Sequence, residues 1–323
     1  MKRQAFVNAL MSALLITVPA LALELGDPAP ALKVEKWIKG GPIDLKAGQG
    51  KNVFVIEFWA TWCAPCRASI PHLTDVQKKY KERGVVVVGI SVDGGAKHPT
   101  RAQVEPFVKE WGEKMDYVVA LDTEERTTME AYMTPFMLNG IPCAFVVDKE
   151  GRLVWAGDPR ENLEKVLDEV LAGKYDLEAA KKADQERRKL AAKEAAARQL
   201  LAKYFETVTA SDKPENVEQL GMLVFIGLDN NPVLLNELAW DILTREDVKY
   251  RDLKLALRAA KVANERSDAK NPAILDTYAR ALFDNGHVQE AIETQKKAVG
   301  LATDPEMKVE LEQALKRYEA AGK

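Results

Sequence analysis

A Cys-x-x-Cys pair at a strand-to-helix junction is the feature of this sequence that most restricts its fold. The segment from Val53 to Trp59 is apolar, of strand length and rich in β-branched and aromatic residues, which predicts a buried strand. The segment from Arg67 to Tyr80 has the pattern of a helix. Cys63 and Cys66 lie between them, so the first sulfur is expected beside the unpaired N–H groups of a helix N-terminus. A thiol at such a position has a lowered pKa, which favours the reactive thiolate.

Two cysteines at this spacing could instead bind zinc, but a structural zinc site needs four ligands. The other candidate ligands are scattered along the chain: Cys143, His72, His98 and His287. The pattern therefore favours a redox-active Cys63–Cys66 disulfide and predicts neither a metal nor another cofactor.

The first 22 residues predict a secretory signal peptide. A positively charged start is followed by an apolar stretch from Ala5 to Val18 and by the small-x-small sequence Ala20-Leu21-Ala22. An uncleaved membrane anchor is the alternative, but the apolar run is short and is interrupted by Asn8 and Ser12. We therefore expect cleavage near Ala22 and an exported, periplasmic protein that is soluble and has no stable membrane anchor.

Composition argues against two classes of protein. The chain has 46 Lys and Arg against 49 Asp and Glu, and this mildly acidic, mixed charge argues against nucleic-acid binding. Three cysteines in 323 residues are too few for a disulfide-stapled scaffold, while 47 % hydrophobic residues support ordinary buried cores. The length predicts two domains.

Short apolar runs alternate with amphipathic segments over residues 23–175, which predicts an α/β domain. Pro71 is expected to kink its first long helix, and Gly84 to end it. Residues 176–206, rich in Ala, Lys and Glu, predict a connecting helix, and residues 207–323 predict an all-α domain. The expected strands are 31–37, 53–59, 85–92, 117–121, 144–148 and 153–156, and the expected helices of the first domain are 64–83, 101–111, 125–132 and 160–171.

The helical region contains an internal sequence repeat. Asn231-Pro232 recurs as Asn271-Pro272 at a spacing of 40, whereas the second halves of the two units match at a spacing of 35. The first unit is therefore expected to have about five extra residues between its two helices, near Arg245–Tyr250. The second unit, with Gly286 at its turn, resembles a tetratricopeptide repeat, a fold that usually presents a concave protein-binding surface. The alternative is that these helices only cap the first domain or stabilise a dimer.

Glu57 lies six residues before Cys63 and shares one strand face with Val53, Val55 and Trp59. Its carboxyl group is expected to be buried beneath the dithiol, where burial raises a carboxyl pKa. A protonatable carboxyl there can carry a proton to and from the less exposed thiol. A strand-edge Glu paired with a lysine is the alternative.

The remaining site residues are expected to contact the substrate. Ile141-Pro142 precedes a predicted strand and is a candidate cis-proline, which would pack against the cysteines while the Ile141 backbone pairs with an extended substrate. Two tryptophans would form an apolar rim. The expected substrate-binding residues are Trp59, Trp62, Ala64, Pro65, Ile141 and Pro142.

Cys143 follows the predicted cis-proline directly. Strand alternation should turn its side chain away from the dithiol and into the core, where it would be an inert packing residue. A third redox-active thiol is the alternative.

Several motifs together resemble the extracytoplasmic thioredoxin-like oxidoreductases of the TlpA/ResA/DsbE type. They are Phe-Trp-Ala-Thr-Trp-Cys-Ala-Pro-Cys at residues 58–66, the proline at 71, Gly-Ile-Pro at 140–142 and Phe-Val-Val-Asp-Lys-Glu-Gly at 145–151. The resemblance implies a thioredoxin fold with an added N-terminal strand pair and an inserted strand–helix segment. It also implies that Cys63 is the nucleophile, Cys66 the resolving thiol, Pro142 the cis-proline and Glu57 the buried acid.

We therefore expect an exported thiol-disulfide oxidoreductase that reduces protein disulfides, is recycled by an electron donor yet to be identified, and binds a protein partner through its helical domain. A scaffold protein acting mainly through the helical repeats is one alternative. A thiol peroxidase is another, but its Pro-x-x-x-Thr-x-x-Cys context would need Pro and Thr at positions 56 and 60, which are Ile and Ala.

Overall fold

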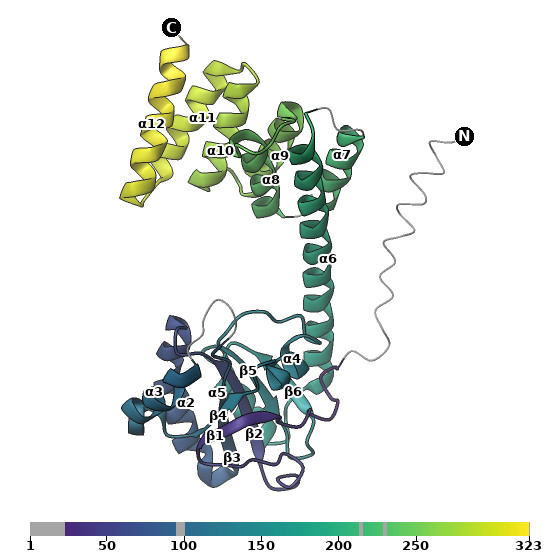
Figure 1. Ribbon diagram of the computed structural model, residues 1–323, viewed down its shortest axis with the longest axis vertical. Helices are drawn as coiled ribbons and strands as arrows, with labels where there is room; N and C mark the ends of the chain where they lie inside the picture. Colours follow the sequence, from purple (N-terminus) through teal and green to yellow (C-terminus); the bar gives the residue numbers. More distant parts are fainter. Residues whose placement is uncertain (1–22, 95–100, 213–215, 229–230, 323) are drawn as a thin grey trace, which may run out of the picture. The chain divides into compact units, whose positions relative to one another are not determined.

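The computed structural model describes residues 23–94, 101–212, 216–228 and 231–322. The expected signal peptide and its cleavage point near Ala22 therefore lie outside the described residues, as does His98. The chain divides into two compact units, residues 1–189 and 190–323, with the division inside helix α6 (Leu177–Ala210) (Figure 1). Among the described residues, no helix combines the length and the apolar character needed to cross a membrane.

A six-stranded mixed sheet forms the centre of the first unit, with the strand order β1-β4-β3-β2-β5-β6. Strand β2 lies inside the sheet, parallel to β3 and antiparallel to β5, and all seven of its residues are buried. Its continuous apolar run, interrupted only by Glu57, is the pattern of a strand covered on both faces. The strands are β1 (Val34–Lys39), β2 (Val53–Trp59), β3 (Val85–Ser91), β4 (Val118–Asp122), β5 (Cys143–Val147) and β6 (Leu153–Gly157).

Helices cover both faces of this sheet (Figure 1). On one face, the Trp59 ring of β2 lies 5.4 Å from the Phe107 ring of α3, and Thr74 of α2 donates a hydrogen bond to the Lys114 carbonyl just after α3. On the other face, Phe58 lies 5.8 Å from Tyr132 of α4. The two faces of β2 therefore pack against different helices. The helices are α2 (Ala64–Tyr80), α3 (Val104–Trp111), α4 (Thr127–Met133), α5 (Leu163–Leu171) and the first part of α6.

The predicted α/β architecture is confirmed, with differences at element ends. The helix expected over residues 64–83 ends at Tyr80 and is followed by a 3-10 turn and by Gly84 at φ 87°. The helix expected from residue 160 begins at Leu163. The added N-terminal strand pair is wrong: the described residues have one strand, β1, and an isolated bridge between Pro28 and Arg152. Pro28 has no N–H group, which prevents a regular ladder there.

The second unit is all-α, as predicted. Asn231 and Asn271 cap helices α8 and α10 in the same way, because each side chain accepts hydrogen bonds from the N–H groups two and three residues later. Residues 245–252 connect α8 to α9, and residues 285–287 connect α10 to α11. The five-residue difference in connection length predicted from the internal repeat is therefore confirmed. Besides the second part of α6, the helices are α7 (Val217–Leu228), α8 (Pro232–Thr244), α9 (Leu253–Arg266), α10 (Pro272–Asp284), α11 (Val288–Leu301) and α12 (Pro305–Ala321).

Candidate active site

Cys63 and Cys66 are joined by a disulfide at the N-terminus of α2, with their Cα atoms 5.2 Å apart. Cys63 is the N-cap residue, and its Sγ accepts a hydrogen bond of 3.2 Å from the Cys66 N–H group. Cys66 is completely buried, whereas Cys63 retains 4 % exposure, so Cys63 is the sulfur that a partner reaches first. An N–H group and the positive end of a helix directed at Sγ would stabilise its thiolate after reduction.

The loop before Cys63 is held by Asp93, a buried residue that follows β3. Its carboxylate accepts hydrogen bonds from the Thr61 N–H group (2.9 Å), the Thr61 hydroxyl (2.6 Å) and the Ser91 hydroxyl (2.8 Å). The sequence interpretation missed this residue. Its signal was an aspartate directly after a buried strand, because the carboxyl ends of parallel neighbours β2 and β3 lie at one edge of the sheet.

The peptide bond between Ile141 and Pro142 is cis, which confirms the predicted cis-proline. Pro142 is buried immediately before β5, and the Ile141 carbonyl oxygen lies 3.6 Å from Cys63 Sγ. The fold thus brings a backbone acceptor, separated from Cys63 by 78 residues, to the more accessible sulfur.

Glu57 is completely buried, and neither carboxyl oxygen has a hydrogen-bond partner among the described residues. Burial, with a smaller contribution from the charge of Asp158, raises the pKa of Glu57 well above its ordinary value. The alternative of a strand-edge Glu paired with a lysine is wrong, since β2 is a central strand and the carboxyl group is unpaired. Because Trp59, two residues later, contacts α3, Glu57 faces the side of the sheet that carries α2.

The expected apolar rim is only partly present. Trp62 is 40 % exposed, and Ala64 and Pro65 are also exposed. Trp59 is completely buried, so its place among the substrate-binding residues was wrong. Strand alternation puts the Trp59 side chain on the same face of β2 as Glu57. Its ring packs on Phe107 of α3 instead of facing solvent.

Cys143 is a free, buried cysteine paired in register with Phe58 of β2. Directly opposed residues of neighbouring strands share a face, so its side chain lies on the α4 face, away from Glu57. Burial raises the pKa of the Cys143 thiol to about 12, which disfavours the reactive thiolate.

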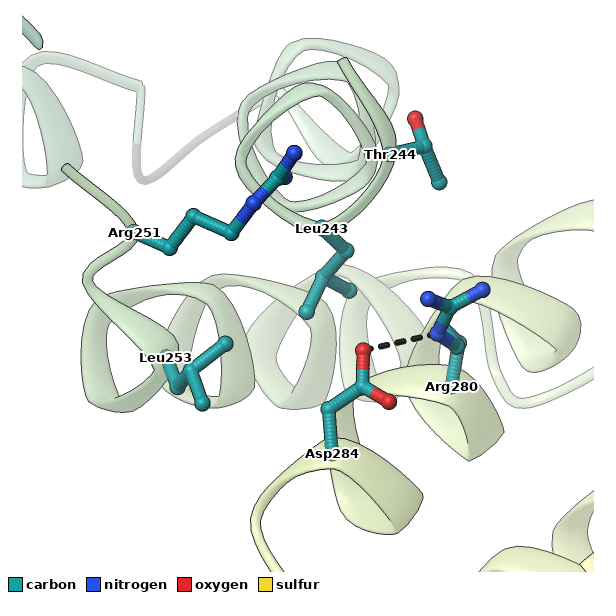
Figure 2. A pocket seen from close by; sticks show the side chains of 6 residues that line it. All are labelled: Leu243, Thr244, Arg251, Leu253, Arg280 and Asp284. Carbon is teal, nitrogen blue, oxygen red and sulfur yellow. Dashed lines mark hydrogen bonds and ion pairs between the residues drawn. The ribbon is translucent and has the colours of Figure 1, made fainter. Parts of the chain in front are cut away.

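Two other kinds of site are relevant in the described parts of both units, a metal site and a ligand-binding hollow. No group of three His, Cys, Asp or Glu side chains there is placed to hold a metal ion. Figure 2 shows a hollow of the helical unit where Arg280 donates a 2.7 Å hydrogen bond to Asp284. Arg251 in the same hollow donates to the Ile242 carbonyl, so both guanidinium groups already have partners. The residues that line it are Leu243, Thr244, Arg251, Leu253, Arg280 and Asp284.

Comparison with known proteins gives matches to part of the chain. Residues 25–156 match the AhpC/TSA family. The chain is 32 % identical over 132 residues to the thiol-disulfide oxidoreductase ResA of Bacillus thuringiensis strain Al Hakam, a match that covers 41 % of this chain and 68 % of that protein. It is 31 % identical over 151 residues to ResA of Bacillus thuringiensis subsp. konkukian, covering 46 % and 79 %. A crystal structure of a thiol:disulfide interchange protein from Chlorobium tepidum is 26 % identical, with a TM-score of 0.36 and coverage of 47 % and 99 %.

Proposed function

We propose that this chain, which belongs to the ResA-type thiol-disulfide oxidoreductases, reduces disulfides of exported proteins through Cys63 and Cys66. The observation that carries the proposal is the disulfide at the N-terminus of α2, with the more accessible sulfur accepting an N–H bond. A scaffold role would need neither a dithiol at a helix end nor a backbone acceptor beside it.

The first step begins from the reduced protein. The Cys63 thiolate attacks one sulfur of a substrate disulfide, the substrate S–S bond breaks, and the other substrate sulfur leaves as a thiolate that takes up a proton. The Cys66 N–H group, 3.2 Å from Cys63 Sγ, stabilises the attacking thiolate. The Ile141 carbonyl, 3.6 Å from the same sulfur, can accept a hydrogen bond from the substrate backbone, which would align an extended segment.

The second step releases the substrate. Glu57 takes the proton of Cys66, and the Cys66 thiolate attacks Cys63 Sγ, which breaks the mixed disulfide. The second substrate sulfur leaves as a thiolate and is protonated. The substrate has gained two electrons and two protons, and the protein is left with the Cys63–Cys66 disulfide seen here. An external dithiol must then reduce this disulfide, with the same bonds exchanged in reverse.

The leader and the helical unit extend this proposal. The charged and apolar start of the chain supports export to the periplasm. In the helix pairs α8–α9 and α10–α11, the first helix of each pair has the same Asn cap, which supports a tetratricopeptide-like array that binds a protein partner. That partner would be the electron donor or a substrate protein.

Insulin reduction tests the proposal. The wild-type protein with a dithiol donor should reduce insulin disulfides, Cys63→Ser should lose this activity, and Cys66→Ala should accumulate a mixed disulfide through Cys63. Cys143→Ser is the matched control because its thiol lies on the opposite sheet face, and it should retain activity. Equal activity of wild type and Cys63→Ser would refute the proposal. Consumption of hydrogen peroxide, with no insulin reduction, would favour the peroxidase alternative instead.

A further inference from the structure

Three buried side chains whose polar groups lack a hydrogen-bond partner among the described residues lie around Gly89 of β3. The groups are the Glu57 carboxyl, the Trp59 indole N–H and the Tyr117 hydroxyl. A Cβ atom added to Gly89 would lie 3.4 Å from Glu57 Oε2, 3.3 Å from Trp59 Nε1 and 2.8 Å from the Tyr117 ring. One small space therefore adjoins all three side chains, which come from β2 and from the segment before β4.

The chemistry of the three groups is complementary. The indole N–H only donates, the phenol can donate, and an ionised carboxylate only accepts. Buried polar groups are seldom left unpaired in folded proteins, so three of them around one glycine call for an explanation. In this disulfide-bonded state the carboxyl group has no proton to take from Cys66. Donors become important once it is ionised.

Among the described residues, no charged group that acts on Glu57 favours its ionised form. The titratable groups that act on it from neighbouring elements are Asp158 after β6, Tyr117 before β4 and the Cys143 thiol of β5. Asp158 carries negative charge, which opposes ionisation of Glu57. In the described parts of the chain, no lysine or arginine is paired with the Glu57 carboxyl group.

We propose that Tyr117 and Trp59 donate hydrogen bonds to Glu57 when its carboxylate is ionised, so that Tyr117 is a positioning residue for proton transfer with Cys66. The inference rests on the proposed role of Glu57. It requires the carboxylate to turn toward the hydroxyl, or to share a water molecule with it, because the two are not within hydrogen-bonding distance in this state. Glycine at position 89 is part of the arrangement, since a Cβ at 2.8 Å would push the Tyr117 ring away.

The test is the pH dependence of disulfide reduction by Tyr117→Phe. Loss of a donor to a charged group disfavours the ionised form, so the acidic limb of the pH–rate profile should move upward by about one pH unit. The pKa of Glu57, followed by carbon-13 NMR of its carboxyl group, should rise by a similar amount. A hydroxyl that matters only for packing would change stability without moving either quantity.

Two further variants make the result specific. Tyr204→Phe removes another completely buried hydroxyl without a partner, but in the helical unit, and its profile should match that of wild type. In a Glu57→Gln background, Tyr117→Phe should produce no further shift. A Tyr117→Phe profile and Glu57 pKa identical to wild type would overturn the inference. An unchanged profile in Glu57→Gln alone would instead refute the role of Glu57 in the proposed function.

Discussion

Replacing Glu57 by glutamine should remove a pH-dependent loss of stability from the redox unit. Burial, and secondarily Asp158, raise the pKa of Glu57 in the folded protein, whereas the same carboxyl titrates near 4.5 in the unfolded chain. Between these two pKa values, the folded protein holds a proton that the unfolded chain has released. Unfolding therefore releases a proton in this range, and the free energy of unfolding falls as pH rises.

The magnitude follows from linkage. One proton released on unfolding lowers the free energy of unfolding by about 1.4 kcal/mol for each pH unit between the unfolded and folded pKa values. Below the unfolded pKa the effect is absent, and above the folded pKa it is complete and constant. Glu57→Gln carries no titratable group at this position, so its stability relative to wild type should rise with this slope. The pH at which the difference levels off measures the folded pKa.

Urea unfolding of the oxidised protein is the appropriate assay, because the disulfide keeps Cys63 and Cys66 from titrating. Tryptophan fluorescence reports mainly on the redox unit, since five of the six tryptophans lie within residues 1–189. The control is Glu125→Gln, which replaces an exposed carboxyl and should leave the slope unchanged. Parallel pH profiles for wild type and Glu57→Gln would show that burial does not raise the pKa, and the reasoning would fail.

Three other substitutions or treatments test separate parts of the structure. Asp93→Ala leaves the Thr61 N–H group and the Thr61 and Ser91 hydroxyls without their acceptor. It should lower the free energy of unfolding of the redox unit, measured in urea, by about 3–5 kcal/mol. A loss below about 1 kcal/mol would show that these hydrogen bonds do not hold the loop before Cys63. Asn271→Ala removes the cap of α10 and should cost the helical unit about 1 kcal/mol by far-UV circular dichroism, with no change in insulin reduction. Cys143 should resist alkylation at pH 8 in the native protein and react once urea unfolds it, because burial raises its pKa to about 12; rapid labelling of the native protein would show a more accessible thiol.

The parts of the site that the sequence predicts are those encoded locally. The apolar run of β2, the cysteine spacing and the helix that follows lie within about 30 residues, so periodicity alone orders them. The cis-proline was also predicted from a local pattern, an X-Pro bond that follows Gly140 and directly precedes a strand. The 40- and 35-residue spacings predicted that the connection between α8 and α9 is longer than the one between α10 and α11, because both spacings are read directly from the sequence.

The missed features depend on contacts between distant segments. Trp59 follows the alternation of β2 correctly, but only the inserted helix α3 shows that its ring is covered, by Phe107. The Tyr117 ring lies beside Gly89, the residue paired with Glu57, because β4 joins β3 and Gly89 leaves room for the ring. The register that pairs Glu57 with Gly89 depends on contacts across the whole sheet, so the local pattern of β2 or β3 alone does not predict it.

Two buried carboxyl groups of the redox unit, those of Glu57 and Asp93, differ in their hydrogen bonding. Among the described residues, the Asp93 carboxylate accepts hydrogen bonds from Thr61 and Ser91, so its loss should mainly loosen the Thr61 loop. Glu57 has no hydrogen-bond partner in the described part of the chain, and burial makes its charged form costly, which is consistent with the proposed exchange of a proton with Cys66. A fully paired carboxylate would lose its hydrogen bonds each time it was protonated, which would oppose proton transfer. An unpaired carboxyl is therefore better suited to proton transfer, and this difference supports the proposal that Glu57 is the proton carrier while Asp93 supports the loop.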